Sequence, residues 1–287
     1  MAILDTETQV SFFVGDFGSG LDHPECVACG PDGTAYAGGE AGQVYRVNVE
    51  QRTFEEYANT GAFVGGMAVD ATHHVYACSG GEVKRITPDG TVSTYTAGSD
   101  ERAMVTPNYP AFDAHGNLYV SDSGAWKEDN GCLYRVAPGG RAEVWCDALT
   151  EFPNGICLHP GGESLYVAVS LNPPRLARVK IESDGTAGEA ETVILLPETV
   201  PDGLAFDTDE NLYISCYRPD RVYRLSASGD LEILAEDVEG TVMAAPTNVA
   251  FCGSNRDVLL SANLGRWHLA CYDVQATGAA LHYPDIS

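Results

Sequence analysis

Residues that carry a side-chain oxygen recur at one position of a repeated sequence pattern. Reading that position along the chain gives Glu25, Gly65, Asn108, Asn154, Asp202 and Thr247, with Asn248 one step further on. Oxygen ligands suit a hard divalent cation such as Ca²⁺, Mg²⁺ or Mn²⁺. The ionised Glu25 and Asp202, together with the neutral Asn154, would balance the charge of one such ion. Coordination positions left open to water or substrate would make this site catalytic.

These positions are equivalent because the chain repeats a unit of four strands. Residues 200–237 contain four short apolar runs separated by Asp, Asn, Gly, Ser and Pro, which favour turns. Copies of the first run begin near residues 24, 64, 107, 153, 201 and 246, at intervals of 40 to 48 residues. That interval is typical of a propeller blade. We therefore predict an all-β fold, a six-bladed β-propeller with four antiparallel strands per blade, as one domain over residues 1–287.

The two ends of the chain predict how the ring closes. Residues 8–14 read as a strand before the first repeat, whereas the last repeat shows only three strands, at 248–252, 257–262 and 267–274. The N-terminal strand should complete the sixth blade, because this removes two exposed sheet edges. Residues 281–283 compete for the same place. In a closed ring the equivalent positions lie at one mouth of the central channel, so Glu25, Asn154 and Asp202 would converge there.

Composition excludes several classes of partner. The net charge of −25 repels phosphate backbones, so we expect no nucleic-acid partner. The charge serves solubility, or attracts cations. The N-terminus lacks the pattern of a signal peptide, and no apolar run is long enough for a membrane span. Several of the nine cysteines sit inside or beside strand-like runs, and we read them as reduced thiols. A cytoplasmic protein with no membrane partner is therefore expected.

With these motifs the chain resembles the regucalcin/gluconolactonase/luciferin-regenerating enzyme family. The similarity covers essentially the whole chain, from HPECVACGPDG through TPNYPAFDAHGNLYVSD and FPNGICLHPGGESLYV to VPDGLAFDTDENLYIS. The resemblance implies a six-bladed, metal-dependent propeller that hydrolyses lactones. It implies Glu25, Asn154 and Asp202 as metal ligands, with Asn108 facing metal or substrate. It also implies that Asp202 acts as the general base.

One departure from the family pattern concerns the substrate. The sugar-lactonase branch has an R-x-N-D pattern around the third-blade Asn, whereas this chain has Thr106 and Tyr109 at the Arg and Asp places. An Arg that would read sugar hydroxyls is missing, and an aromatic ring replaces a carboxylate. We therefore expect a flatter or more apolar lactone than gluconolactone.

Loops between second and third strands should surround the site. The long segment 121–131 carries Trp126 and is the natural lid. The expected substrate-binding residues are Asn108, Tyr109, Trp126, Asn172 and Tyr217, with Arg218, Asn263 and Arg266 on the neighbouring loops. His73 and His74 fall in a turn on the opposite face, so we expect no catalytic role for them.

The sequence thus predicts a metal-dependent hydrolase that opens a lactone or related cyclic ester at the central channel. The cofactor would be one divalent cation, Ca²⁺ first, with Mg²⁺, Mn²⁺ or Zn²⁺ as alternatives. The partner would be a small-molecule, lactone-like substrate, and the protein a monomer or weak homo-oligomer. Two other classes stay open: a metal-free biosynthetic propeller enzyme of strictosidine synthase-like type, and a non-catalytic binding propeller.

Overall fold

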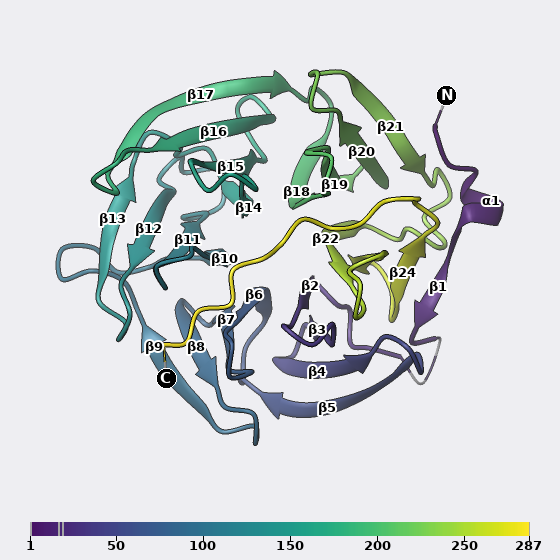
Figure 1. The fold of residues 1–287 in the computed structure, drawn as a ribbon, viewed down its shortest axis with the longest axis horizontal. Helices are drawn as coiled ribbons and strands as arrows, with labels where there is room; N and C mark the ends of the chain where they lie inside the picture. Colours follow the sequence, from purple (N-terminus) through teal and green to yellow (C-terminus); the bar gives the residue numbers. More distant parts are fainter. Residues whose placement is uncertain (1, 17, 19, 287) are drawn as a thin grey trace.

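Six antiparallel sheets of four strands form a ring in the computed structural model, which describes residues 2–16, 18 and 20–286 (Figure 1). This confirms the predicted six-bladed β-propeller. In each blade the first strand lies nearest the centre of the ring and later strands lie progressively further out (Figure 1). The first strands of neighbouring blades therefore pack side by side around the channel.

The strands of the six blades follow chain order. Blade 1 contains β2 (Cys26–Cys29), β3 (Ala35–Gly38), β4 (Gln43–Asn48) and β5 (Thr53–Asn59). Blade 2 contains β6 (Val64–Val69), β7 (Val75–Ser79), β8 (Glu82–Ile86) and β9 (Val92–Thr96). Blade 3 contains β10 (Pro107–Phe112), β11 (Leu118–Asp122), β12 (Cys132–Val136) and β13 (Ala142–Cys146). Blade 4 contains β14 (Pro153–Leu158), β15 (Ser164–Val169), β16 (Arg175–Ile181) and β17 (Ala187–Leu195). Blade 5 contains β18 (Val200–Phe206), β19 (Leu212–Arg218), β20 (Arg221–Leu225) and β21 (Leu231–Glu236). Blade 6 contains β22 (Pro246–Cys252), β23 (Val258–Asn263), β24 (Leu269–Tyr272) and the N-terminal strand β1 (Val10–Val14).

The N-terminal strand closes the ring, as predicted. Strand β1 pairs antiparallel with β24, and Ser11 lies opposite Cys271. It begins two residues later than expected because a short helix, α1 (Thr6–Gln9), precedes it. The side chain of Asp5 caps that helix by accepting a hydrogen bond from the backbone N–H of Glu7.

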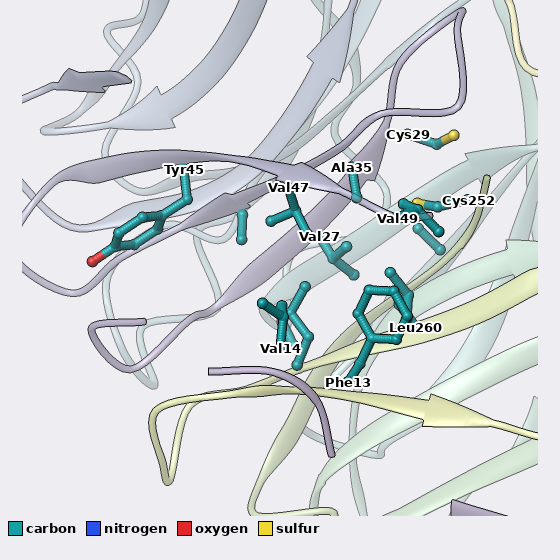
Figure 2. Packing of buried hydrophobic residues seen from close by; sticks show 14 of the residues in the cluster. Phe13, Val14, Val27, Cys29, Ala35, Tyr45, Val47, Val49, Cys252 and Leu260 are labelled. Atoms are coloured by element: carbon teal, nitrogen blue, oxygen red, sulfur yellow. The ribbon is translucent and has the colours of Figure 1, made fainter. Parts of the chain in front are cut away.

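Apolar packing between blades 6 and 1 supports this closure. Phe13 and Val14 of β1 are buried in a cluster with Val27, Val47 and Leu260 (Figure 2). Complete burial of such a side chain contributes about 1.5–3 kcal/mol. The N-terminal strand is therefore held by its side chains as well as by the sheet.

The C-terminal segment crosses one face of the ring and does not compete for the closing position (Figure 1). Its Ala279 N–H donates to the carbonyl of Phe206, where β18 ends. Further on, the carbonyl of Pro284 accepts a hydrogen bond from the Ala71 N–H of blade 2. The segment thus covers the channel mouth at which the first strands end, opposite the mouth at which they begin.

No helix in the described residues is long and apolar enough to cross a bilayer.

Candidate active site

The first strands of blades 2 to 6 share an irregular beginning. In each of them, two residues near the start of the strand interrupt the pairing with the second strand. The pair is Asn154 with Gly155 in blade 4, and Asp202 with Gly203 in blade 5. Such irregularities redirect side chains. They occur at the register position where the sequence predicted the ligands.

Two glycines let neighbouring first strands approach closely at this level. A Cβ atom on Gly155 would lie 2.1 Å from the carbonyl oxygen of Asp202. A Cβ atom on Gly203 would lie 2.5 Å from the Cα of Asn248. Both contacts are too short for any side chain, so these positions require glycine. The turn-like Asn-Gly and Asp-Gly dipeptides therefore serve packing between blades.

Buried serines fix the backbone of the same residues. The Ser121 hydroxyl of blade 3 donates to the carbonyl of Asn154 at 2.6 Å. The Ser170 hydroxyl of blade 4 donates to the carbonyl of Pro201 at 2.7 Å. Ser215 of blade 5 donates in the same way to the carbonyl of Thr247 in blade 6. The second strand of one blade thus positions the first strand of the next.

Four polar side chains are buried together at this mouth of the channel. Glu25, Asn154, Asp202 and Asn248 are 7, 4, 4 and 1% exposed. Among the described residues, the buried carboxylate and carboxamide oxygens without a hydrogen-bond partner are Glu25 Oε2, Asn154 Oδ1 and Asn248 Oδ1. Leaving such an oxygen buried and unpaired costs about 1–3 kcal/mol. Three of them in one site indicate that a ligand accepts their lone pairs, and a divalent cation fits this set of donors.

The electrostatics of the two carboxylates favour a bound cation. Burial raises the pKa of Glu25 well above its usual value, and the charge of Asp202 raises it further. Burial also raises the pKa of Asp202, against a hydrogen bond from Asn154. Two carboxylates in a buried space destabilise each other's ionised form. A cation between them would remove that penalty.

A second group of possible metal ligands lies on the loops of blade 1. Ligand atoms of Asp22, His23 and Glu40 lie within 4.8 Å of one another. These atoms already have partners, since Asp22 accepts a hydrogen bond from the Ala41 N–H at 3.0 Å and His23 pairs with both carboxylates. None of the three residues is buried. The group therefore lacks the unpaired buried oxygens that mark the channel mouth.

Asn108 and Tyr109 occupy different environments. Asn108 is half-buried, and within the described part of the chain we find no hydrogen bond to its carboxamide. Tyr109 packs against Gly66, where a Cβ atom would lie 2.4 Å from the ring. Its side chain lines a cavity of about 120 Å³ that extends toward the C-terminal segment. Tyr109 therefore lies deeper in the channel than the sequence indicated.

The predicted lid is anchored beside the candidate ligands. The Ser123 hydroxyl donates to the carbonyl of Pro153 at 2.8 Å, next to Asn154. At the tip, Trp126 is 58% exposed and contacts Phe152 edge-on, with 5.0 Å between the ring centroids. Asn172 joins the same rim, because its amide donates to the carboxylate of Asp129 at 3.1 Å. Trp126 and Asn172 thus both lie at the rim of blades 3 and 4, through separate contacts with Phe152 and Asp129.

The other loop residues divide into two groups. Tyr217 is partly exposed on blade 5, and the guanidinium of Arg218 lies 4.9 Å from the centroid of its ring. Arg266 donates to the carbonyl of Gly240. Asn263, in contrast, is fully buried and donates to the carbonyls of Ser261 and His268. The expectation that Asn263 lines the pocket is wrong, because its amide holds backbone together inside blade 6.

The two discounted histidines lie on the opposite face, as predicted. His73 and His74 fall in the turn between β6 and β7, where the C-terminal segment binds blade 2. His74 contacts the carboxylate of the buried Asp70 at 3.2 Å. His74 thus contributes to the structure of this turn.

The structure adds Asn248 to the site. The alignment of repeats favoured Thr247, but that hydroxyl donates to the backbone carbonyl of Glu25. Asn248 is the second of the two unpaired residues in β22, and its amide lies 3.4 Å from a carboxylate oxygen of Asp202. In the sequence, the only indication of this role is that Asn248, a polar residue, directly follows the aligned position, Thr247.

Fold and site together define a class, six-bladed propellers with buried oxygen donors at one channel mouth. The chain belongs to the SMP-30/gluconolactonase/LRE-like family, whose model matches residues 91–262. A model of the N-terminal part of strictosidine synthase-like proteins matches residues 16–47.

Solved structures with the same fold include a calcium-binding protein, regucalcin, from Agrobacterium tumefaciens. It is 18% identical, covers 96% of this chain and 97% of its own, and has a TM-score of 0.77. A gluconolactonase from Xanthomonas campestris is 20% identical over 91% of this chain and 88% of its own, with a TM-score of 0.76. At these identities the likeness establishes the fold.

Curated relatives include proteins named lactonase drp35. The one from Staphylococcus saprophyticus is 25% identical over 161 residues, which is 54% of this chain and 49% of the relative. The one from Staphylococcus aureus strain MW2 is 22% identical over 202 residues, 66% of this chain and 61% of the relative. The chain spans about half the length of the curated relatives it matches.

Proposed function

We propose that this protein is a divalent-metal-dependent lactonase with its active site at the channel mouth formed by the beginnings of the first strands. The observation that carries the proposal is the group of unpaired buried oxygens on Glu25, Asn154 and Asn248 beside the carboxylate of Asp202. The names of the relatives support the reaction, since they include lactonases and a gluconolactonase.

Glu25, Asn154 and Asp202 would hold the ion. All three supply oxygen, which favours Ca²⁺, with Mg²⁺, Mn²⁺ or Zn²⁺ as alternatives. The two carboxylates together balance the charge of one divalent cation. The relative described as a calcium-binding protein, regucalcin, supports Ca²⁺ as the ion.

The proposed reaction adds water across the ester bond of a lactone and yields a hydroxy acid. When bound, a divalent cation polarises an ester carbonyl and lowers the pKa of water. Asp202 would act as general base, taking the proton from the attacking water and returning it to the ring oxygen as the acyl C–O bond breaks. The Asn154 amide, which donates to the Ser170 hydroxyl at 3.2 Å, would also help to orient the Asp202 carboxylate. Because the Asp202 carboxylate is buried, bulk water has little access to it during this proton transfer.

Substrate recognition would come from the rim of the mouth. We infer contacts with Asn108, Trp126, Asn172 and Tyr217, while Tyr109 would limit the depth of the pocket. The exposed indole of Trp126 offers an apolar surface. Together with the substitution of Thr106 and Tyr109 for the sugar-reading pair, this favours a small, weakly polar lactone.

The cysteines and the net charge bear on the compartment and the partners of the enzyme. The nine cysteines are free thiols, which suits a reducing, cytoplasmic compartment. The charge of −25 disfavours nucleic acid as a partner. We propose a monomer or weak homo-oligomer acting on a small molecule.

A chelator experiment with a panel of lactones tests the reaction. Chelator-treated protein should be inactive, and stoichiometric Ca²⁺ or another divalent ion should restore turnover. Activity that persists without metal would favour a metal-free propeller enzyme, the alternative to which the strictosidine synthase-like match at residues 16–47 points. A protein that binds lactones without opening them would instead be a binding propeller.

A further inference from the structure

The side chain of Asn248 is placed like a ligand. It is 1% exposed and lies at the unpaired beginning of β22 in blade 6. Its backbone is fixed from the preceding blade, because Ser215 donates to the carbonyl of Thr247 and the Cα of Asn248 packs on Gly203. Asn248 is therefore held in place before any ligand binds.

The orientation of its carboxamide follows from its neighbours. Nδ2 donates to Asp202 Oδ1 at 3.4 Å, whereas Oδ1 is buried without a partner. When Asp202 is ionised, as a metal ligand must be, the reverse orientation would place the amide oxygen against a carboxylate oxygen, and neither atom carries a proton to share. The unpaired atom of Asn248 is thus an acceptor.

We propose that Asn248 is a fourth protein ligand of the divalent ion held by Glu25, Asn154 and Asp202. This inference rests on the proposed metal site. The four residues come from the contiguous blades 4, 5, 6 and 1, and three of them carry an unpaired buried oxygen. A Ca²⁺ ion takes six to eight oxygen ligands, so four protein residues leave places for water and substrate.

The other two blades contribute little to the proposed ion site at this level. At the same level, blade 2 contributes Gly65 and Gly66, which have no side chain to offer. Blade 3 contributes the half-buried Asn108, whereas the ring of Tyr109 lies deeper in the channel. Blades 4, 5, 6 and 1 therefore supply the proposed ligands.

Calorimetric titration of chelator-treated protein with CaCl₂ tests the role of Asn248. Asn248→Leu keeps a similar volume but removes the oxygen. Its Ca²⁺ affinity should fall by roughly 10–100-fold or more, since even the loss of an outer partner of a ligand has an effect of that size. The rise in Tm that Ca²⁺ produces should shrink in parallel.

Asn263→Ala provides a matched control. Asn263 is also a buried asparagine of blade 6, but its Oδ1 accepts a hydrogen bond from Ser261. This variant should melt at a lower temperature with and without Ca²⁺, yet keep the wild-type affinity and the wild-type Ca²⁺-dependent rise in Tm.

Unchanged Ca²⁺ affinity in Asn248→Leu would overturn the assignment. If that variant does not fold, Asn248→Asp replaces it, and an added carboxylate ligand should tighten Ca²⁺ binding; unchanged or weaker binding would again overturn the proposal. These readouts do not depend on turnover. Metal binding that requires Asn248 in a protein inactive on lactones would refute the lactonase reaction alone, whereas wild-type protein that binds no divalent ion would refute both.

Discussion

Thr247 joins the last blade of the propeller to the first, because its hydroxyl donates a hydrogen bond to the backbone carbonyl of Glu25, 222 residues earlier in the chain. Both residues lie at the channel mouth where the candidate ligands gather. Closure of the ring and placement of the Glu25 carboxylate therefore depend on the same part of the structure. Any change that loosens the closure should also weaken metal binding.

Asp202→Ala and Asn154→Ala should differ in their response to metal. The Asp202 variant loses a charged ligand and the proposed base, so excess metal should not restore its activity. A lost general base lowers the rate by roughly 10²–10⁴-fold. The Asn154 variant loses one neutral oxygen, so its activity should recover in part at high metal concentration. Turnover measured against metal concentration checks both expectations, and equal rescue of the two variants would contradict the role of Asp202.

The stability of chelator-treated protein should fall as pH rises from about 4, the ordinary carboxylate pKa. Burial raises the pKa of Asp202, and burial with the charge of Asp202 raises that of Glu25. The folded protein therefore binds more protons than the unfolded chain between the ordinary and raised pKa values, and its free energy of unfolding decreases with pH there. Chemical unfolding at a series of pH values measures this slope.

Asp202→Asn is the control for that pH dependence. The variant cannot ionise at position 202 and cannot repel Glu25, so its stability should decline less steeply with pH. Added metal should reverse the trend in the wild type, because binding requires deprotonated ligands. Identical slopes for variant and wild type would show that this pair does not govern the pH dependence.

Deletion of residues 1–15 should open the ring. It removes β1 and leaves the outer edge of β24 unpaired, together with the buried surface around Phe13 and Val14. We expect an aggregated or unfolded protein by size-exclusion chromatography and thermal melting. Ser11→Ala keeps the backbone pairing and should melt like the wild type. A soluble truncation with unchanged melting would contradict closure by the N-terminal strand.

Deletion of residues 277–287 should destabilise the protein without removing metal binding. The segment binds the ends of the first strands, as in the hydrogen bond from the Tyr283 hydroxyl to the Cys29 carbonyl at 3.1 Å. The candidate ligands lie at the beginnings of those strands. We expect a lower Tm and an unchanged Ca²⁺ affinity in calorimetric titration. A folded truncation that no longer binds Ca²⁺ would show that the segment supports the site.

Gluconolactone should be a poorer substrate than less polar lactones. Thr106 and Tyr109 cannot supply the Arg and Asp that read sugar hydroxyls in the sugar-lactonase branch. Initial rates over a lactone panel measure the preference, and efficient, preferred hydrolysis of gluconolactone would contradict it. Trp126→Ala should raise KM for the apolar members without lowering Tm, because this side chain is 58% exposed.

The repeat pattern was enough to predict the ring, its closure and the register of the candidate ligands. Strand alternation and turn residues are local properties, so six copies of one local pattern indicate six blades. Once the blades are equivalent, one register position marks one level of the channel. That is why Glu25, Asn154 and Asp202 could be grouped although they are far apart in the chain.

The remaining features of the site depend on contacts between blades. A local sequence pattern does not specify such contacts. The hydrogen bonds of Thr247 to Glu25 and of Asn248 to Asp202 each join separate repeats. They explain why Asn248, and not Thr247, turns an unpaired oxygen to the channel. Tyr109 lies deep in the channel because Gly66 of the neighbouring blade makes room for its ring. Burial, which sets the pKa of Asp202 and leaves oxygens without partners, exists only after the ring has closed, because water satisfies the same groups in the unfolded chain.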